Sequence, residues 1–555
     1  MRTLLLSVLV GVSSASPVSA AIIYVNAAQA LPPESQNGLT WPTAFKSLTD
    51  AITLAQAGDQ IWVAKGTYVP NNTLDRTATF ILGPFTQMYG GFSVGATSLA
   101  ERDPVANPTI LSGDRGIPGD ISDNCTHVVR LFSGTNVLLD GLIIEKGNAD
   151  LGTAGEKIGA GIQLSSCPSF VLRDCVLRGN KSGNNGGAIH GLNSTLIAQG
   201  CVFADNSALS SGGAIRTQAT VTTFANCTFV GNSSGSGGAV LVFAASSTTF
   251  VNCMLSGNHA SAGGGAIQIS STPATIANCT FANNVSTGLS GGAILMFGTA
   301  SANAISNSVF QGNAAPTNPN ITPNALTTVS FCSFDAAPSA GTGNFVADAS
   351  FVDADGADDV AGTVDDDLHL RSTSPCIDRA SGALLPADAS DLDGDGNVAE
   401  PLPVDIDGDA RAIDDAVENG GVGAVNFIDI GADEFDRPTR VVFVNRAARG
   451  DKSGTSWKNA HTDFQEGSST RARRPSRSRS KFGSRRERTC RRTAPIARRP
   501  SPRTGRSRSS ADSPETRLRA ANADPLSAPR SSPARSARRR RGTTPSTWWT
   551  SAATT

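Results

Sequence analysis

Three aspartates alternate with other residues in the sequence Asp-Leu-Asp-Gly-Asp-Gly that begins at Asp391. Carboxylates at alternate positions can converge on one hard cation, and the glycines permit the sharp turn of such a loop. Asp391, Asp393 and Asp395 match the first, third and fifth positions of an EF-hand calcium loop. The twelfth position is Leu402 where that loop has a glutamate, and Glu400 stands at the tenth. We therefore expect a structural calcium site that departs from the EF-hand.

A shorter copy of the same pattern follows, with Asp405, Asp407 and Asp409 around a glycine. Both copies lie in the segment 341–436, which carries 24 acidic and 3 basic residues. Such a charge density is self-repulsive, and a bound cation would help to order it. Calcium is the only cofactor that the sequence suggests, and solvated acidic turns are the alternative interpretation.

Catalytic residues cannot be assigned with the same ease. A paired-carboxylate glycosidase needs two acids that face one groove. Between residues 150 and 315 the acidic residues are Asp150, Glu156, Asp174 and Asp205. Asp174 and Asp205 fall at different places in the repeat described below. The five histidines, including His190 and His259, are expected to be solvated rather than catalytic.

A repeat of 26 residues runs through the middle of the chain. It places cysteines at Cys175, Cys201, Cys227, Cys253 and Cys279, and Ser308 takes the same place 29 residues later. A second phrase, Gly-Gly-Ala-Ile or Gly-Gly-Ala-Val, begins at residues 186, 212, 237, 264 and 291. Short alternating runs between clusters of Gly, Asn and Ser predict strands and turns. Short strands at a fixed period are typical of a solenoid whose coils stack about 4.8 Å apart.

Stacking turns each repeated residue into a ladder. The cysteine and the apolar residue two positions later share a face, so both ladders should point into the core. Parallel thiols have poor disulfide geometry, so buried free thiols are favoured over disulfides, although export would supply an oxidising compartment. Repeated asparagines should form structural hydrogen-bonded ladders, with a ligand role as the alternative. They are Asn180, Asn206, Asn232, Asn258, Asn284 and Asn313.

The N-terminal region predicts export and a cap. Residues 1–20 combine a basic start, an apolar run and a small-residue cleavage site before Ala21, which are the features of a secretory signal peptide. No later run of apolar residues is long enough to span a membrane, so we expect the mature chain to lack a transmembrane segment. Phe45, Leu48 and Ile52 are spaced three and four apart, which predicts a short amphipathic helix that caps the solenoid.

Several phrases resemble exported bacterial right-handed parallel β-helix proteins of the pectin-lyase-like superfamily. They are IYVNAA at 23–28, GDQIWVAKGTY at 58–68, MYGGF at 88–92 and NPTILSGD at 107–114. The repeated GGAI and FxxN phrases are similar to the repeat of the polymorphic outer membrane protein family, which implies an adhesive role at the cell surface. FVDADG at 351–356, LHLRSTSPCID at 368–378 and VNFIDIGADEF at 425–435 look like the C-terminal module of choice-of-anchor Q proteins. That resemblance implies a cap or attachment module.

The last part of the chain has a different composition, because residues 468–555 carry 24 basic and 4 acidic residues. Such a tail could bind nucleic acid, but this conflicts with export. A back-translation of Lys481–Arg491 read two bases later yields VWVAKGTYVP, and WVAKGTYVP also stands at 62–70. We therefore predict a reading-frame slip near Gly467, which resequencing of the DNA there would test. A chain made as written should have a disordered tail.

These patterns predict an all-β, right-handed parallel β-helix with a short N-terminal capping helix. The expected divisions are a signal peptide at 1–20, the β-helix at 21–340, an acidic cap or anchor-like module at 341–436, the start of a second β-helix module at 437–467 and the basic tail at 468–555. The expected function is that of a non-catalytic secreted, cell-surface or outer-membrane protein that is adhesive or binds glycans. Its partners would be glycans or cell-surface components and no nucleic acid. A polysaccharide lyase or glycoside hydrolase is the alternative.

Overall fold

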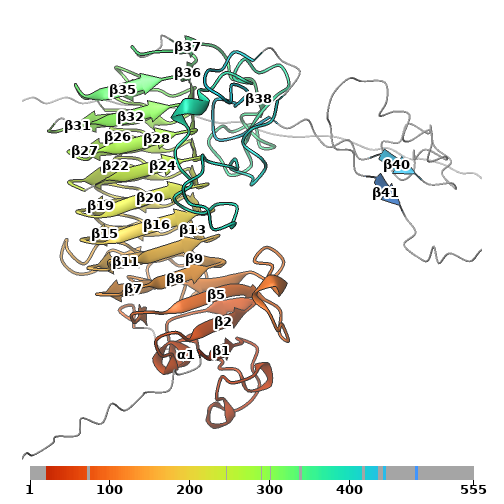
Figure 1. Ribbon diagram of the computed structural model, residues 1–555. Coiled ribbons are helices and arrows are strands. Elements are labelled where there is room, and N and C mark those ends of the chain that lie inside the picture. The colour runs from red at the N-terminus through yellow and green to blue at the C-terminus, as the bar shows by residue number, and fades with distance from the viewer. Residues whose placement is uncertain are drawn as a thin grey trace, which may run out of the picture. The chain divides into compact units, whose positions relative to one another are not determined.

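The computed structural model describes residues 20–71, 75–245, 247–288, 290–299, 302–336, 340–414 and 419–435, together with the backbone of two short strands at 442–444 and 482–484. Most of this chain is a parallel β-solenoid, which confirms the predicted right-handed parallel β-helix (Figure 1). Each coil passes in turn through three long sheets, which we call A, B and C, and most of the middle coils add a short strand of sheet D between B and C.

Sheets A and B each have 11 strands. Sheet A consists of β1 (Ile22–Val25), β2 (Gln60–Ala64), β5 (Gln87–Phe92), β8 (Val137–Asp140), β12 (Phe170–Arg173), β16 (Thr195–Gln199), β20 (Val221–Ala225), β24 (Thr248–Val251), β28 (Ala274–Ala277), β32 (Asn303–Ser306) and β35 (Thr327–Ser330). Sheet B consists of β3 (Gly66–Tyr68), β6 (Thr109–Ser112), β9 (Leu142–Glu145), β13 (Val176–Arg178), β17 (Val202–Ala204), β21 (Thr228–Val230), β25 (Met254–Ser256), β29 (Thr280–Ala282), β33 (Val309–Gln311), β36 (Ser333–Phe334) and β37 (Phe345–Val346).

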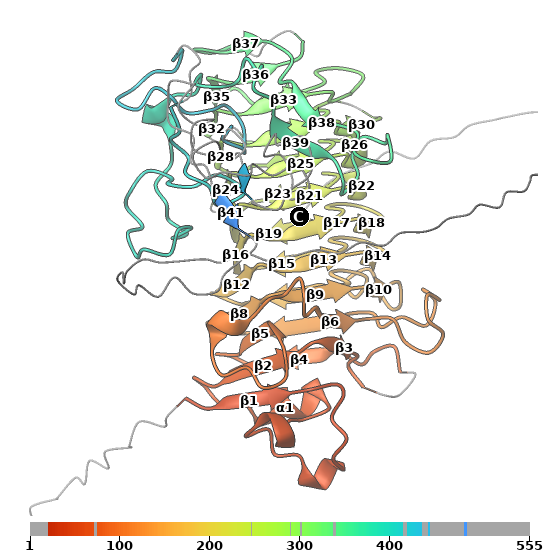
Figure 2. The same cartoon turned by 90° about the vertical axis from the view of Figure 1, so that its right-hand side faces the viewer.

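Sheets C and D complete the coils (Figure 2). Sheet C consists of β4 (Phe80–Leu82), β7 (Val129–Phe132), β11 (Ile162–Ser165), β15 (Ile189–Leu192), β19 (Ile215–Gln218), β23 (Val240–Phe243), β27 (Ile267–Ser270), β31 (Ile294–Phe297) and β34 (Ile321–Thr322). Sheet D consists of β10 (Asn148–Ala149), β14 (Lys181–Ser182), β18 (Ser207–Ala208), β22 (Ser233–Ser236), β26 (His259–Gly263) and β30 (Val285–Ser286). Because β37 pairs with β36, the solenoid continues to Val346, beyond the boundary expected at residue 340.

The core contains the ladders that the repeat predicts. All five repeated cysteines are buried and free. Burial raises the pKa of Cys175, Cys201, Cys227 and Cys253 well above the usual value. Ser308 fills the same slot because its hydroxyl donates to the Ser306 carbonyl at 2.8 Å. The aromatic ladder lies beside it, with ring centroids 4.8 Å apart for Phe203 and Phe229.

The asparagine ladder is buried and continuous. The Oδ1 atom of Asn232 accepts hydrogen bonds from the backbone N and from Nδ2 of Asn206, at 3.0 and 3.1 Å. Its Nδ2 donates to Oδ1 of Asn258 and to the Phe203 carbonyl. Each amide thus satisfies backbone groups of the turn before it, so the structural interpretation of these residues is confirmed.

The N-terminal end is capped by less helix than expected. The helix α1 spans Leu48–Leu54, with Ser47 accepting a hydrogen bond from the Asp50 backbone N at its start. The stretch before it forms the 3₁₀ turn η2 (Trp41–Thr43) and an extended link. Leu48 is buried in the core as predicted, and Phe45 and Ile52 pack against it. Further 3₁₀ turns are η1 (Pro33–Ser35), η3 (Leu99–Glu101) and η4 (Gly382–Leu384).

Residues 347–435 lie beside the solenoid and extend along several of its coils (Figure 1). We call this segment the acidic module. Its two strands, β38 (Phe351–Asp353) and β39 (Asp367–Leu370), pair antiparallel. Its apolar side chains, including Ile428, pack against Ala282 and Val309 on the outer face of sheet B. The module therefore packs laterally on the β-helix.

Other expectations fall mostly outside the described residues. These are the signal peptide, the start of a second module at 437–467 and the basic tail, apart from Ala20 and the two short strands. Those strands, β40 (Val442–Val444) and β41 (Phe482–Ser484), pair parallel. The reading-frame slip and the signal peptide stay predictions. No helix among the described residues is long and apolar enough to cross a membrane.

Candidate functional site

The acidic module is held by a second asparagine ladder at the corner between sheets A and B. Asn226 and Asn252 adopt the left-handed backbone there, with φ near 50°, and their side chains point to the module. Their Nδ2 atoms donate to the carbonyls of Asp405 and Val404, each at 2.7 Å. Asn307, on a later coil, bonds the backbone N and O of Ser381 at 2.9 and 3.1 Å.

The repeat contains this corner ladder, but the sequence reasoning missed it. These asparagines come directly before the cysteine or serine of each unit, where earlier units have Asp174 and Gly200. A polar residue at a fixed place in successive coils is the signal that could have found it. One coil earlier, Gln199 donates a hydrogen bond to the carbonyl of Ser390, so the contact extends over five successive coils.

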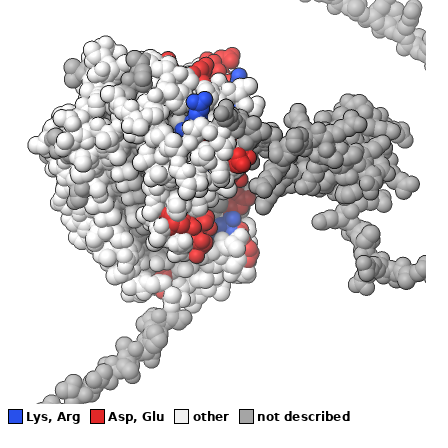
Figure 3. All heavy atoms as spheres, turned by 45° about the horizontal axis from the view of Figure 1, so that its top comes forward, with Lys and Arg blue, Asp and Glu red and all other residues white. Residues whose placement is uncertain are grey.

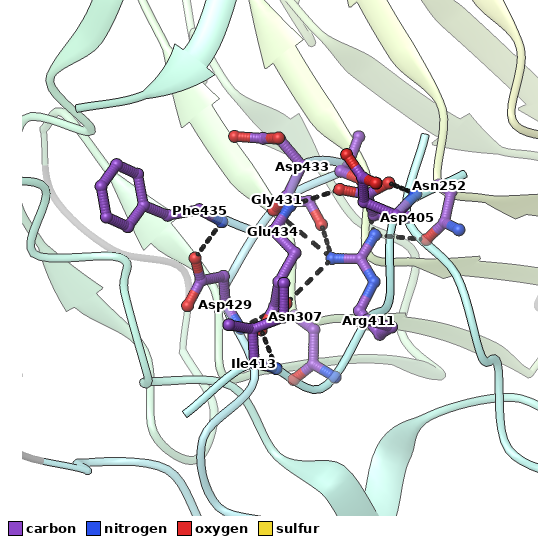
Figure 4. A network of polar contacts seen from close by, with 12 residues as sticks. Asn252, Asn307, Asp405, Arg411, Ile413, Asp429, Gly431, Asp433, Glu434 and Phe435 are labelled. Atoms are coloured by element: carbon purple, nitrogen blue, oxygen red, sulfur yellow. Dashed lines mark hydrogen bonds and ion pairs between the residues drawn. The ribbon is translucent and has the colours of Figure 1, made fainter. Parts of the chain in front are cut away.

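Arg411 is the centre of the module's inner face (Figure 4). Its side chain is 1% exposed and donates to Oδ1 of Asn252 at 2.6 Å and to the Ala432 carbonyl at 2.5 Å. Its Nη1 atom lies 3.7 Å from a carboxylate oxygen of Glu434. That carboxylate also accepts from the backbone N of Asp429, at 3.0 Å. The guanidinium thus joins the β-helix to the last segment of the module.

This network buries more acid than base. Asp405, Asp429 and Glu434 are all buried around the single guanidinium of Arg411. Burial, reinforced by the Asp378 carboxylate, raises the pKa of Asp429, and burial together with the Asp429 charge raises the pKa of Glu434. Desolvation penalises the charged form more than one cation 3.7 Å away can favour it. At least one of these carboxyl groups is therefore expected to be protonated near neutral pH.

The first predicted loop does bring its carboxylates together. Ligand oxygens of Asp391, Asp393 and Asp395 lie within 4.8 Å of one another. The loop is folded by its own side chains, since Asp391 accepts a hydrogen bond from the Gly396 backbone N at 2.9 Å and Asp395 accepts from that of Asn397 at 2.7 Å. Both glycines of this loop have positive φ, as a sharp turn requires.

Two further carboxylates lie beside this acidic loop. Neither was predicted as a metal ligand from the sequence. Asp388 and Glu400 have oxygens within 4.8 Å of Asp393. Asp388 is 1% exposed, and its Oδ1 has no hydrogen-bond partner among the described residues. Burial, with the Asp393 and Asp391 charges nearby, raises its pKa. Glu400 was recognised at the tenth position of the pattern, whereas Asp388 precedes the motif and carries no spacing signal.

The second predicted loop is built differently. Asp405 turns inward, where its carboxylate accepts from the backbone N of Asp407 and Asp409, both at 3.0 Å, and of Glu434. Its oxygens are thus used to fold the turn and to hold the last segment of the module. Asp407 points the other way and lies 2.7 Å from Nε2 of His369. The three aspartates do not converge as those of the first loop do.

His369 and Asp407 lie in a cavity of about 640 Å³. The lining includes Asp409, Asp433 and the backbone of the last module segment. The hydrogen bond from His369 holds the pKa of the Asp407 carboxyl below its usual range, and the same bond raises the pKa of His369 to about 10. Burial raises the pKa of Asp433 to about 6.

Asp174 and Asp205, which lie one coil apart, are on different corners of the β-helix. Asp174 is on the corner between sheets A and B, whereas Asp205 follows β17 on the corner between B and D. Asp150 is bound to Arg76 at 2.6 Å. Two histidines correct an expectation, because His127 and His190 are both buried, the latter on β15 beside Arg216. Burial lowers the pKa of each to about 4. His259 is exposed, as predicted.

Sheet C has aromatic side chains on its outer face. Phe132, Phe243 and Phe297 are 47%, 40% and 47% exposed. The strand register puts all three in one column, separated by Ser165, Leu192, Gln218 and Ser270. The adjacent column holds Arg130, whose guanidinium lies 4.8 Å from the Phe132 ring. Aromatic faces beside basic and amide groups are a surface to which sugars can bind.

One family of repeats matches part of the β-helix. The Chlamydia polymorphic membrane protein repeat matches residues 174–192 and 200–218, which are parts of two successive coils. No curated protein sequence matches the chain significantly.

Three solved structures are similar in chain path. A rhamnogalacturonan lyase is 12% identical with a TM-score of 0.37, over 60% of this chain and 91% of that one. The pectate lyase Pel9A is 13% identical with a TM-score of 0.42, over 76% and 98%. A pectin methylesterase from Aspergillus niger is 12% identical with a TM-score of 0.27, over 60% and 87%. At such low sequence identities and TM-scores, no functional residue of these enzymes can be assigned to a position in this chain.

Proposed function

We propose that the mature protein is an exported, non-catalytic β-helix that binds glycans at the cell surface or after secretion. The exposed aromatic column of sheet C carries this proposal. Since coils repeat about every 4.8 Å, Phe243 and Phe297 are about 10 Å apart and Phe132 is about 19 Å further along. Such a row can stack against several sugar rings of one extended chain. The similarity to a membrane-protein repeat supports a place at the surface.

The adjacent column favours an acidic glycan. Arg130 and Arg216 lie three coils apart, with Gln163 and His190 between them in the same column. A guanidinium binds a carboxylate through two parallel hydrogen bonds. We therefore expect polymers with uronic acid units to bind better than neutral polymers of the same length.

The test is binding of the full chain to immobilised polygalacturonate and to a neutral glucan. Phe243→Ala and Phe297→Ala should each weaken binding to polygalacturonate at least tenfold. Leu209→Ala is the control, because Leu209 is 77% exposed on the loop after β18, away from sheet C. Equal binding by all three variants, or no binding by the parent protein, would rule out this surface.

A polysaccharide lyase is the alternative, and product release separates the two. Cleavage by a lyase leaves unsaturated ends that absorb ultraviolet light. The binding proposal expects no such product from polygalacturonate, with or without calcium. Calcium-dependent turnover by the parent protein would establish the alternative instead.

We also propose that the first acidic loop binds one calcium ion. Asp388, Asp391, Asp393, Asp395 and Glu400 would supply the oxygens, and calcium accepts six to eight at about 2.4 Å. The buried, unpartnered oxygen of Asp388 supports this, because an anion without a partner is costly to bury.

Calcium should raise the melting temperature of the parent protein, and the rise should be absent in Asp388→Asn. The exposed Asp358→Asn in the same module is the control. An equal rise in all three proteins would mean that calcium acts elsewhere, and no rise in the parent would leave these residues as solvated turns.

A further inference from the structure

A second group of potential metal ligands lies at the cavity of the acidic module. His369, Asp407 and Asp433 offer one ligand atom each, and these atoms lie within 4.8 Å of one another. They come from three segments that are far apart in sequence. The cavity of about 640 Å³ beside them leaves space for water or another ligand.

Rigid neighbours position each of the three side chains. His369 is on β39, which is paired with β38. The turn that holds Asp407 is fixed by the buried carboxylate of Asp405. Asp433 is in the segment held by Arg411, and its Oδ2 accepts from the Leu370 backbone N at 2.8 Å. The ligand backbone is thus in place before any cation arrives.

The histidine has the orientation that metal sites use. Its Nδ1 is hydrogen-bonded to a carboxylate oxygen of Asp367, two residues earlier on the same strand. This bond fixes the ring and leaves Nε2 facing Asp407 and Asp433. Imidazoles that bind metals commonly use their second nitrogen in this way, on a carboxylate outside the coordination sphere.

We propose that His369, Asp407 and Asp433 form a site for a divalent transition metal such as Zn²⁺, with Asp367 as the residue that orients the imidazole. A mixed imidazole and carboxylate set suits Zn²⁺ or Mn²⁺ better than Ca²⁺, which prefers oxygen alone. The metal displaces the proton that the raised pKa keeps on His369 at neutral pH. The neutral imidazole and the two carboxylates then carry two negative charges, which a divalent cation balances. The remaining coordination positions face the cavity.

The ligand pair formed by His369 and Asp407 requires only a small movement. Ligand atoms at about 2.1 Å from a tetrahedral metal are about 3.4 Å apart. Nε2 of His369 and Oδ2 of Asp407 are now 2.7 Å apart, so Asp407 has to move back by about 0.7 Å. Its side chain is 49% exposed and can do so without disturbing the core.

Cobalt provides the direct test, because Co²⁺ in a low-symmetry protein site absorbs visible light. Titration of the full chain with Co²⁺ should give a saturable band at one ion per chain, and Zn²⁺ should remove it. His369→Ala should abolish the band. Asp407→Asn should weaken Co²⁺ binding at least tenfold and, because Asp407 is half exposed, should leave the melting temperature of the metal-free protein nearly unchanged.

The controls separate this site from the acidic loop and from adventitious histidine binding. His259→Ala removes an exposed imidazole on β26 and should leave the band unchanged. Asp391→Asn should leave it unchanged as well, because it alters only the first acidic loop. A band that persists in both His369→Ala and Asp407→Asn would overturn the proposal. Absence of any band in the parent protein would show that His369 and the two aspartates form an ion-paired cluster only.

Discussion

Replacing Arg411 with methionine should release the acidic module from the β-helix. The change removes the only basic group of the network and leaves Glu434 and Asp429 buried without a cation. It also leaves acceptors on Asn252 and Ala432 without their donor. Removing one partner of a buried ion pair costs about 3–5 kcal/mol, because the other charge stays buried. We expect a loss of that size in the free energy that holds the module in place.

Hydrogen exchange measures this directly. The backbone N of Gly431 donates to the carbonyl of Asn307 at 2.9 Å, so its protection reports the contact between the module and the β-helix. A loss of about 3–5 kcal/mol accelerates its exchange between about a hundredfold and several thousandfold. Amides of the inner coils, such as Phe229, should keep their protection. Proton uptake by Glu434 and Asp429 lessens the repulsion between them, so the effect should be smaller at pH 5 than at pH 8.

Arg379→Met is the matched control. This arginine is in the same module, but it is exposed and its guanidinium lies 5.7 Å from the Phe345 ring. An exposed contact of this kind contributes about 0.5–1 kcal/mol. Acceleration of Gly431 exchange by less than tenfold in Arg411→Met, or by equal amounts in both variants, would refute the reasoning.

Three further predictions follow from buried groups. Burial raises the pKa of Asp429 to about 8, so the stability contributed by its protonated form is complete below its unfolded value and is lost as the pH rises toward 8. The free energy of module release, measured in urea, should therefore fall between pH 5 and 8, by about 1.4 kcal/mol per pH unit at most, and a rise would contradict this. Asn232→Ala should cost about 2–5 kcal/mol in urea unfolding because four buried hydrogen bonds are lost. The half-buried Asn184 donates one hydrogen bond to the Ala154 carbonyl at the surface, so Asn184→Ala should cost only about 1 kcal/mol; equal losses would dismiss the ladder as a source of stability. The nine described cysteines are all buried and free, so alkylation followed by peptide mass spectrometry should modify none of them before unfolding, and rapid labelling of Cys227 would show that the core opens.

Much of this fold can be predicted from the sequence because the sequence repeats. A residue such as Cys227 or Asn232 recurs every 26 residues, so its place in one coil fixes its place in all. The errors fall where repetition gives no information. His190 was assigned to solvent because a single histidine has no period, and the structure buries it beside Arg216. The helix α1 begins only at Leu48 because the preceding residues form a 3₁₀ turn.

The acidic module shows the same limit more strongly. The motif correctly indicates that Asp391, Asp393 and Asp395 lie together, since all three are within five residues. The same motif around Asp405 folds a turn instead. The difference comes from the nearby Arg411, which donates a hydrogen bond to Asn252, 159 residues away in the sequence. No local pattern contains a contact of that kind. It depends on how a non-repeating segment packs on the corner of the solenoid.

The module, residues 347–435, carries 23 acidic and 3 basic residues, yet the described residues of the β-helix do not meet it with a row of cations. The β-helix uses amides instead. The side chains of Asn226, Asn252 and Asn307 form hydrogen bonds with backbone groups of the module and carry no charge. The contact therefore does not depend on the acidic side chains. Many of these side chains remain on the outer surface (Figure 3). If docking were the purpose of the negative charge, basic residues should line this corner. The charge is better explained by what the outer surface binds, since both proposed cation sites are built from these carboxylates.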